Sequence, residues 1–233
     1  MGGFDFSAIV SVLPFLLKGL TYTIQLTVVA AIGGTLLGIL LALARLSHLK
    51  WLSMLAAGYI NLMRSIPLLL VIFWFYFLVP VMLQSITGSD YPPKIGAERS
   101  AYVTFILFEA AYFAEIVRAG IQSIPKGQLG AAYALGLTYA QSMRLIILPQ
   151  ALRNMLPVLL TQTIVLFQDV SLVALLNVTD FVGAAMKIAQ RDCRVVEMYT
   201  LVAVVYFVLS FLLSQGVKRS EERRVGKECR SRW

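Results

Sequence analysis

Long apolar stretches without a charged residue dominate the pattern along this chain. They run from Gly19 to Ala44, from Ser65 to Ser89 and from Met198 to Val217. Each is at least as long as the roughly 20 residues that a helix needs to cross the hydrocarbon core of a bilayer. Only helices and closed barrels satisfy their backbone groups in lipid, and runs of this length favour helices. The pattern therefore predicts an all-α integral membrane protein.

Two further segments are apolar enough to span although they carry acidic residues. The first contains Glu109 and Glu115, and the second contains Asp169. About five spanning helices result, predicted at residues 19–44, 65–84, 100–121, 152–176 and 197–217. Residues 19–217 then form one membrane domain behind a segment of residues 1–18. The apolar run after that segment is too long for a cleavable signal peptide.

The stretch from Trp51 to Met63 is too short to span. Its apolar residues Trp51, Leu55 and Tyr59 fall on one helical face, which suits a helix lying at the membrane surface before the chain turns at Pro67. The alternative is an N-terminal extension of the second span.

Basic residues in the loops indicate the orientation. Arg45 and Lys50 follow the first span, whereas only Lys18 precedes it. Because Lys and Arg gather on the cytoplasmic side, we expect residues 1–18 in the periplasm and the C-terminus in the cytoplasm.

The tail, residues 219–233, reads RSEERRVGKECRSRW and differs from the rest of the chain. It resembles the in-frame translation of a DNA-sequencing adapter, and we expect it to be an artefact; a basic tail at the membrane surface is the alternative. The tail holds six of the 20 basic and three of the 12 acidic residues, so the net charge without it falls from +8 to +5. A net charge of this size does not indicate nucleic-acid binding. Cys193 would then be the one cysteine, which excludes a disulfide or a metal cluster within the chain.

The loop between the third and fourth spans is basic, and a series of small and apolar residues stands in it. These are Gly130, Ala131, Ala132, Gly136, Ile146, Leu148 and Pro149. Small residues let a short helix lie closely in a groove of another protein, and Gly136 lets the chain turn. We expect Pro149 to stop the helical run before the next span.

This spacing resembles the signature of permease subunits in ATP-binding-cassette (ABC) importers, which reads Glu-Ala-Ala, then Gly, then Ile-x-Leu-Pro. Gly130 replaces the usual Glu, which removes one salt bridge to the ATPase. Three more segments resemble the polar amino-acid branch of these importers, namely Arg64–Pro67, Phe108–Ile121 and Leu166–Val173. Gln190–Asp192 followed by Val196–Met198 is similar to permeases of glutamate/aspartate importers. The resemblance covers roughly residues 4–217.

The resemblance implies the transmembrane fold of type I importers and a place in the bacterial inner membrane. It implies three partners besides lipid: ATPase subunits on which the loop helix docks, a second permease subunit that is similar or identical, and a periplasmic solute-binding protein. The sequence from Met1 to Lys218 contains no phosphate-binding Gly-x4-Gly-Lys-Ser/Thr motif, so we expect no cofactor here and ATP and Mg on the partner ATPase.

Charged residues inside a membrane are costly, so each one needs a reason. Glu115 and Arg118 are three residues apart on one helix and can form a structural ion pair. The candidates for a translocation pathway are Glu109, Thr161, Gln162, Gln168 and Asp169. Glu109 and Asp169 could instead bond to neighbouring helices and stabilise the bundle.

An acidic amino acid would prefer basic groups along its route, yet no Lys or Arg falls in the middle of a predicted span. Three explanations stay open: its ammonium meets Glu109 or Asp169, the partner subunit supplies the base, or the substrate is not anionic. Two other functions also use these acids, a membrane enzyme with an acid/base pair and a channel or secondary transporter. Neither explains the spacing from Gly130 to Pro149.

Overall fold

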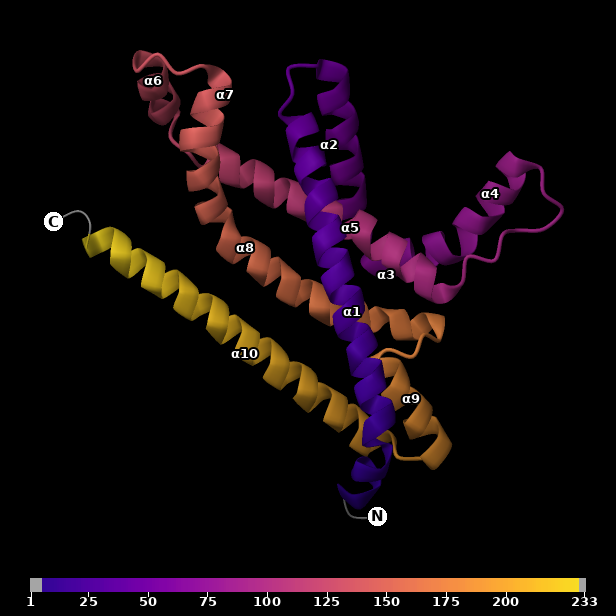
Figure 1. The fold of residues 1–233 in the computed structure, drawn as a ribbon. Coiled ribbons are helices and arrows are strands. Elements are labelled where there is room, and N and C mark those ends of the chain that lie inside the picture. Colours follow the sequence, from indigo (N-terminus) through magenta and orange to yellow (C-terminus); the bar gives the residue numbers. More distant parts are fainter. Residues whose placement is uncertain (1–5, 231–233) are drawn as a thin grey trace. The chain divides into compact units, whose positions relative to one another are not determined.

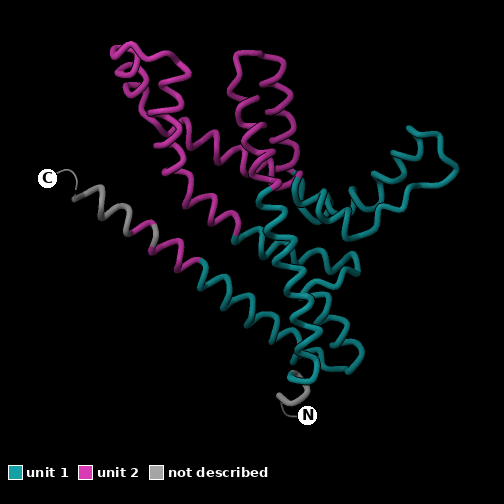
Figure 2. The backbone as a smooth tube through the Cα atoms, in the orientation of Figure 1, with its two compact units in different colours: residues 1–32, 66–106, 164–213 teal, residues 33–65, 107–163, 214–233 magenta. Residues whose placement is uncertain are grey.

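The computed structural model describes the backbone of residues 6–230, and the side chains of residues 10–219, 221 and 222. The chain divides into two compact units (Figure 2). Unit 1 comprises residues 1–32, 66–106 and 164–213, and unit 2 comprises residues 33–65, 107–163 and 214–233. Each unit has its own buried core.

Within residues 6–230 the chain is helical throughout and has no strand (Figure 1). The elements are α1 (Phe6–Arg45), α2 (Lys50–Ser65), α3 (Leu68–Phe73), η1 (Trp74–Leu78), α4 (Val79–Thr87), α5 (Ala97–Gln122), α6 (Lys126–Ala134), α7 (Tyr139–Ser142), η2 (Met143–Ile147), α8 (Leu148–Asp169), η3 (Val170–Leu176), α9 (Phe181–Asp192) and α10 (Val195–Arg230).

Five helical segments of the described chain are long and apolar enough to cross a membrane, which confirms the predicted all-α membrane protein. They are Val10–Arg45, Leu68–Thr87, Ala97–Gln122, Tyr139–Leu176 and Val195–Arg219. The first starts earlier than predicted, because α1 continues through Lys18 and Pro14. A lysine near a helix end can extend its ammonium to the membrane surface, so one charge need not end a span. Residues 1–5 and 231–233, at the ends of the predicted N-terminal segment and tail, lie outside the described residues.

Pro149 does not end a helix, contrary to the prediction. It lies in the first turn of α8, and helix continues unbroken from Tyr139 through η2 into α8. The segment η2 is a π-helix in which the Leu148 N–H donates to the Met143 carbonyl, five residues back. Proline lacks an N–H and its ring crowds the preceding turn, and a wider turn ahead of it relieves both problems.

The same device occurs in the second span. The π-helix η1 precedes Pro80, and the Val79 N–H donates to the carbonyl of Trp74. Both prolines are thus accommodated inside continuous spans.

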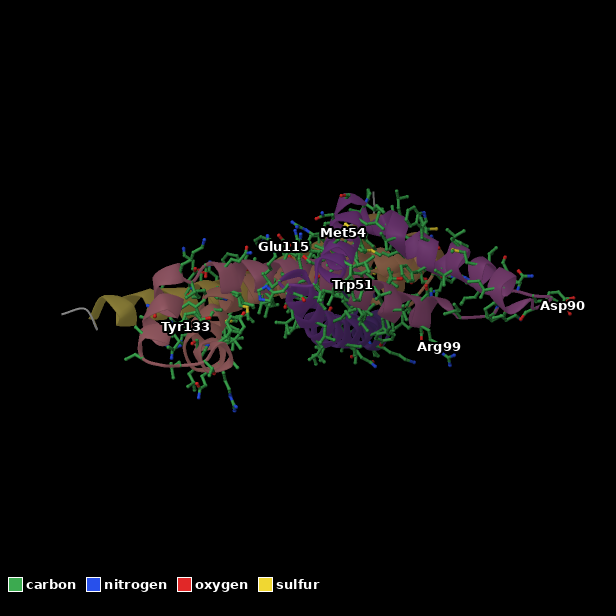
Figure 3. The ribbon with its side chains drawn as sticks, turned by 90° about the horizontal axis from the view of Figure 1, so that it is seen from above. Trp51, Met54, Asp90, Arg99, Glu115 and Tyr133 are labelled. Carbon is green, nitrogen blue, oxygen red and sulfur yellow. The ribbon has the colours of Figure 1, made fainter. Side chains whose placement is uncertain are left out.

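The short segment after the first span is a separate helix, α2, which runs back beside the second half of α1 within unit 2 (Figure 1). Ile60 of α2 is buried in the core of this unit, together with Ala42, Ala114, Val117 and Met155. Trp51 and Met54 of the same helix are exposed (both are labelled in Figure 3). Pro67 separates α2 from α3, so α2 is not an extension of the second span.

Unit 2 is held together by close helix contacts at glycines. A methyl group added to Gly38 of α1 would lie 2.8 Å from the Phe113 Cβ and 2.9 Å from the Ala114 backbone nitrogen of α5. Gly34, one turn earlier, lies against Glu109 and Phe113 in the same way. Such small residues four apart let two helices pack backbone to backbone.

Unit 1 is built where the N-terminus of α9 meets α1. A methyl group on Gly19 would lie 2.6 Å from the Asp180 carbonyl oxygen, so only glycine permits this approach. The Thr23 hydroxyl oxygen accepts a hydrogen bond from the Phe181 N–H at 3.0 Å. The Asp180 carboxylate caps α9 by accepting from the N–H groups of Gly183 at 2.8 Å and Val182 at 3.2 Å.

Burial raises the pKa of Asp180 from 3.8 to about 6, although its capping hydrogen bonds act in the opposite direction. A raised carboxyl pKa favours the folded state at low pH, and this contribution is lost as the pH rises from about 4 to about 7. Asp180→Asn keeps a capping oxygen but cannot ionise. We expect the melting temperature of the variant to rise relative to that of the wild type by several degrees between pH 5 and pH 7.5, since about half of the roughly 3 kcal/mol that the shift corresponds to is lost in this range.

Asp192→Asn is the matched control, because Asp192 is exposed and the adjacent Arg191 guanidinium lowers its pKa. Its melting temperature should follow the wild type closely over this pH range. An equal pH response of Asp180→Asn and the wild type would contradict the assignment.

Candidate functional site

The first half of the loop signature forms the short helix α6 and its end. Gly136 has a φ of +76°, in the left-handed region that favours glycine. Its N–H donates to the Tyr133 carbonyl at 2.9 Å, and the Leu137 N–H donates to the Ala132 carbonyl at 3.1 Å. These two bonds make a Schellman motif, which satisfies the last carbonyls of the helix. The positive φ at the end of α6 therefore requires glycine at position 136.

The second half of the signature belongs to the next helical segment. Thr138 and Gln141 form a capping box that starts α7, and α7 continues through η2 into α8. Ile146 lies in η2, whereas Leu148 and Pro149 open α8. Both α7 and η2 contact α6. The two halves of the signature thus build a helical hairpin.

Apolar side chains are exposed on this hairpin. Tyr133, Leu135 and Tyr139 are 49%, 78% and 57% exposed, and Tyr133 projects from α6 (Figure 3). Gly130 and Ala131 lie on the exposed part of α6, while Ala132 is buried. Nothing lies within 4 Å of the place that a Gly130 side chain would take. A surface of small backbone-near residues framed by exposed apolar groups suits contact with another protein.

Glu115 is the centre of an ion-pair network in unit 2. Its carboxylate pairs with Arg118 on the same helix and also with Arg45 at the end of α1. Arg118 additionally donates to the Gln122 side chain at 2.6 Å. The sequence predicted the pair with Arg118, but Arg45 was assigned only to a basic loop. No local signal identifies Arg45, since it is 70 residues away from Glu115.

Two of the five pathway candidates meet in unit 2. The Gln162 side-chain amide of α8 donates to the Glu109 carboxylate of α5 at 3.0 Å, and Glu109 is fully buried. This contact supplies a neighbouring-helix partner that the sequence could not identify. Charge-neutral donors of this kind let a buried carboxylate remain inside a helical bundle.

The other three candidates do not join that contact. The Thr161 hydroxyl donates to the Pro157 carbonyl of its own helix at 3.0 Å. Gln168 and Asp169 belong to unit 1, where Gln168 is exposed and Asp169 is half-buried at the end of α8. Their place on a pathway stays a prediction.

A cavity of about 450 Å³ lies in unit 2 among α2, α5 and α8. Arg64 is in its wall, with its guanidinium 5.6 Å from the centre of the Tyr112 ring. Gln162 lines the same cavity. The sequence indicated Arg64 only as part of the segment Arg64–Pro67 and gave it no role of its own, because its neighbours come from distant parts of the chain.

Spanning helices, an exposed helical hairpin between two of them and a buried polar contact are typical of a membrane transport subunit that contacts another protein. The family "Binding-protein-dependent transport system inner membrane component" matches residues 34–227. The chain belongs to this family, as its loop signature predicted.

Individual relatives agree with this assignment. The glutamate/aspartate import permease protein GltK of Escherichia coli O6:H1 is 52% identical over 221 residues, covering 94% of this chain and 98% of the relative. The probable amino-acid ABC transporter permease protein YckA of Bacillus subtilis is 38% identical over 196 residues, covering 84% and 83%. A crystal structure of an amino acid ABC transporter with histidines superimposes with a TM-score of 0.84 at 33% identity, covering 94% of this chain and 98% of that one. The predicted type I importer fold is confirmed.

Gly136→Ala should weaken the end of α6. A side chain at this φ costs about 1–2 kcal/mol, and the Schellman motif would open. We expect a lower melting temperature for the importer complex and several-fold slower ATP-driven uptake at unchanged expression.

Gly130→Ala is the matched control on the same helix. Its site is open and helical, so alanine should stabilise α6 by about 0.5–1 kcal/mol. Equal effects of the two substitutions would argue against a specific role for the Gly136 turn.

Glu115→Gln should destabilise unit 2, because Arg45 and Arg118 would then face each other without a carboxylate. Hydrogen bonds to charged groups contribute about 1.5–3 kcal/mol each, and the partial exposure of these groups reduces that figure. Thermal unfolding of the purified complex measures the loss. Glu98→Gln, an exposed acid in the first turn of the same helix, should change the melting temperature far less.

Proposed function

We propose that this chain is the permease subunit of an ABC importer that brings glutamate and aspartate across the bacterial inner membrane. The assignment of glutamate and aspartate as the cargo rests on the 52% identity with GltK over nearly the whole of both chains. Relatives of other cargo are less similar, such as the Bacillus subtilis arginine permease ArtQ at 34%. The segment from Gln190 to Asp192, followed by Val196 to Met198, supports the same cargo.

ATP hydrolysis takes place on separate ATPase subunits in this proposal, and α6 is the helix that docks on them. The exposed Tyr133, Leu135 and Tyr139 would be covered in that contact. Gly130, which stands where the family signature has Glu, removes one salt bridge but leaves the small, open docking surface.

Two more partners complete the importer. A second permease subunit, similar or identical, closes the pathway, and a periplasmic solute-binding protein delivers the amino acid. With the N-terminus in the periplasm and the C-terminus in the cytoplasm, the loop from α4 to α5, which carries the exposed Tyr91, faces the binding protein. The α6 hairpin then faces the cytoplasm.

Transport follows from coupling these surfaces. ATP binding closes the ATPase pair, the α6 helices move with it, and the permease pair changes from inward-open to outward-open. The binding protein then releases the amino acid into the pathway. Hydrolysis of ATP resets the permease pair and lets the cargo leave on the cytoplasmic side.

Glu109, Gln162 and Asp169 supply polar groups for the cargo along the membrane interior. The hydrogen bond from Gln162 to Glu109 holds these two side chains at one level of unit 2. The ammonium group of an amino acid is the natural partner of such carboxylates.

Competition uptake in proteoliposomes tests the cargo. The complex of this chain with its ATPase and binding protein should take up labelled L-glutamate when ATP is supplied. Excess unlabelled L-aspartate should abolish that uptake, whereas L-arginine should leave it unchanged. If neither acidic amino acid competes while a neutral one does, the assignment of glutamate and aspartate as cargo is wrong, but the assignment as an amino-acid importer is retained. Uptake without ATP would contradict the importer itself.

A further inference from the structure

We propose that the cavity around Arg64 is a second binding site for the amino-acid cargo, in which Arg64 receives the carboxylate that all amino acids share. This inference rests on the proposed role in amino-acid import. It concerns residues of α2, α5 and α8 in unit 2, and of the pathway candidates its wall includes Gln162.

Arg64 is a cation whose hydrogen-bond donors are available. No residue in the described part of the chain forms an ion pair or a hydrogen bond with it, and its guanidinium lies over the Tyr112 ring. A cation–π contact of this kind attracts the guanidinium but does not use its N–H groups, which can still donate to a ligand. That arrangement presents a two-pronged donor, the usual partner of a carboxylate.

The charges nearby favour an anion at this place. Glu115, the acidic residue of the cavity wall, is already paired with Arg45 and Arg118. Arg64 also lies close enough to Glu115 to interact with it electrostatically, so three guanidinium groups act on this one carboxylate. An incoming carboxylate would offset this excess positive charge at low cost in desolvation.

The cavity has the size and lining of a small-molecule site. Its volume of about 450 Å³ lies within the roughly 300–1,000 Å³ of such pockets, and its walls are mainly apolar with a few polar groups. Ser123 and Asn154, joined by a hydrogen bond of 3.0 Å, lie in the wall with Arg64. They add a hydroxyl and an amide that can bind a polar ligand.

The same cavity also offers a group for the other end of an amino acid. Gln162 donates its amide N–H to Glu109, which leaves its carbonyl oxygen as an acceptor for an ammonium group. A ligand with carboxylate and ammonium groups on one carbon thus finds a cation and an acceptor in one cavity. The sequence has no Lys or Arg in the middle of a predicted span, and the fold brings Arg64 from the end of α2 into the wall of this cavity.

A cysteine protection experiment tests occupancy of the cavity without altering Arg64. Ser123→Cys is introduced into the assembled importer in nanodiscs, with Cys193→Ser and Cys229→Ser to remove background labelling. We expect millimolar L-glutamine and L-glutamate, without binding protein, to slow alkylation of the new thiol several-fold. L-glutamine methyl ester, which lacks a carboxylate, should not slow it.

Direct binding of labelled L-glutamine to the same complex tests Arg64 itself. Arg64→Gln should weaken binding at least about tenfold, because it removes a charge-assisted hydrogen-bonding pair, and Arg64→Lys should restore part of the affinity. The matched control is Lys50→Gln, which removes one positive charge from the other end of α2, outside the cavity wall. It should bind as the wild type does.

Each result decides the proposal. Protection by the free amino acids alone, with loss of binding in Arg64→Gln, supports the carboxylate site. Equal protection by the methyl ester, no protection by any ligand, or unchanged binding in Arg64→Gln would overturn it. Protection by L-glutamine but not by L-glutamate would keep the site and reject the acidic cargo. If Arg64→Gln does not assemble, the protection experiment alone decides.

Discussion

The pairing of one carboxylate with two guanidinium groups is the interaction on which unit 2 depends. Glu115 on α5 holds Arg45 at the end of α1 and Arg118 on its own helix. This fixes the end of the first span, from which α2 turns back to place Arg64 beside Tyr112. The glycine contacts bring α1 and α5 together without any directional bond. The ion pairs of Glu115 add bonds of defined direction between the two helices. The order of helices around the cavity follows from it.

The sequence predicted the spans and the loop signature well, because both are local patterns. Charge-free runs identify membrane helices. The turn after α6 is also a local signal, because the positive φ at position 136 requires a glycine whatever its neighbours are. Contacts between distant segments carry no such pattern. Arg45 was interpreted as a loop cation and Arg64 as part of a motif, and only the packing of α1, α2 and α5 gives them their neighbours.

Pro149 shows why a correct local rule gave a wrong boundary. Proline disfavours helix in the residues before it, so the sequence favoured a stop. The chain instead widens one turn in η2 and keeps the helix, since the wider turn makes room for the proline ring and the Leu148 N–H still finds a carbonyl partner. The second example, η1 ahead of Pro80, shows that the same widening accommodates a proline elsewhere in the chain.

These widened turns also alter how positions are counted along the spans. An α-helix advances about 100° per residue, so one additional residue in a turn rotates everything beyond it by about that angle. Residues on either side of η2 that are seven apart in the sequence therefore do not share a face, whereas residues eight apart do. A helical wheel drawn straight through Met143–Ile147 assigns the side chains of α8 to the wrong neighbours. Pairs chosen for cross-linking across this span have to be offset by one position.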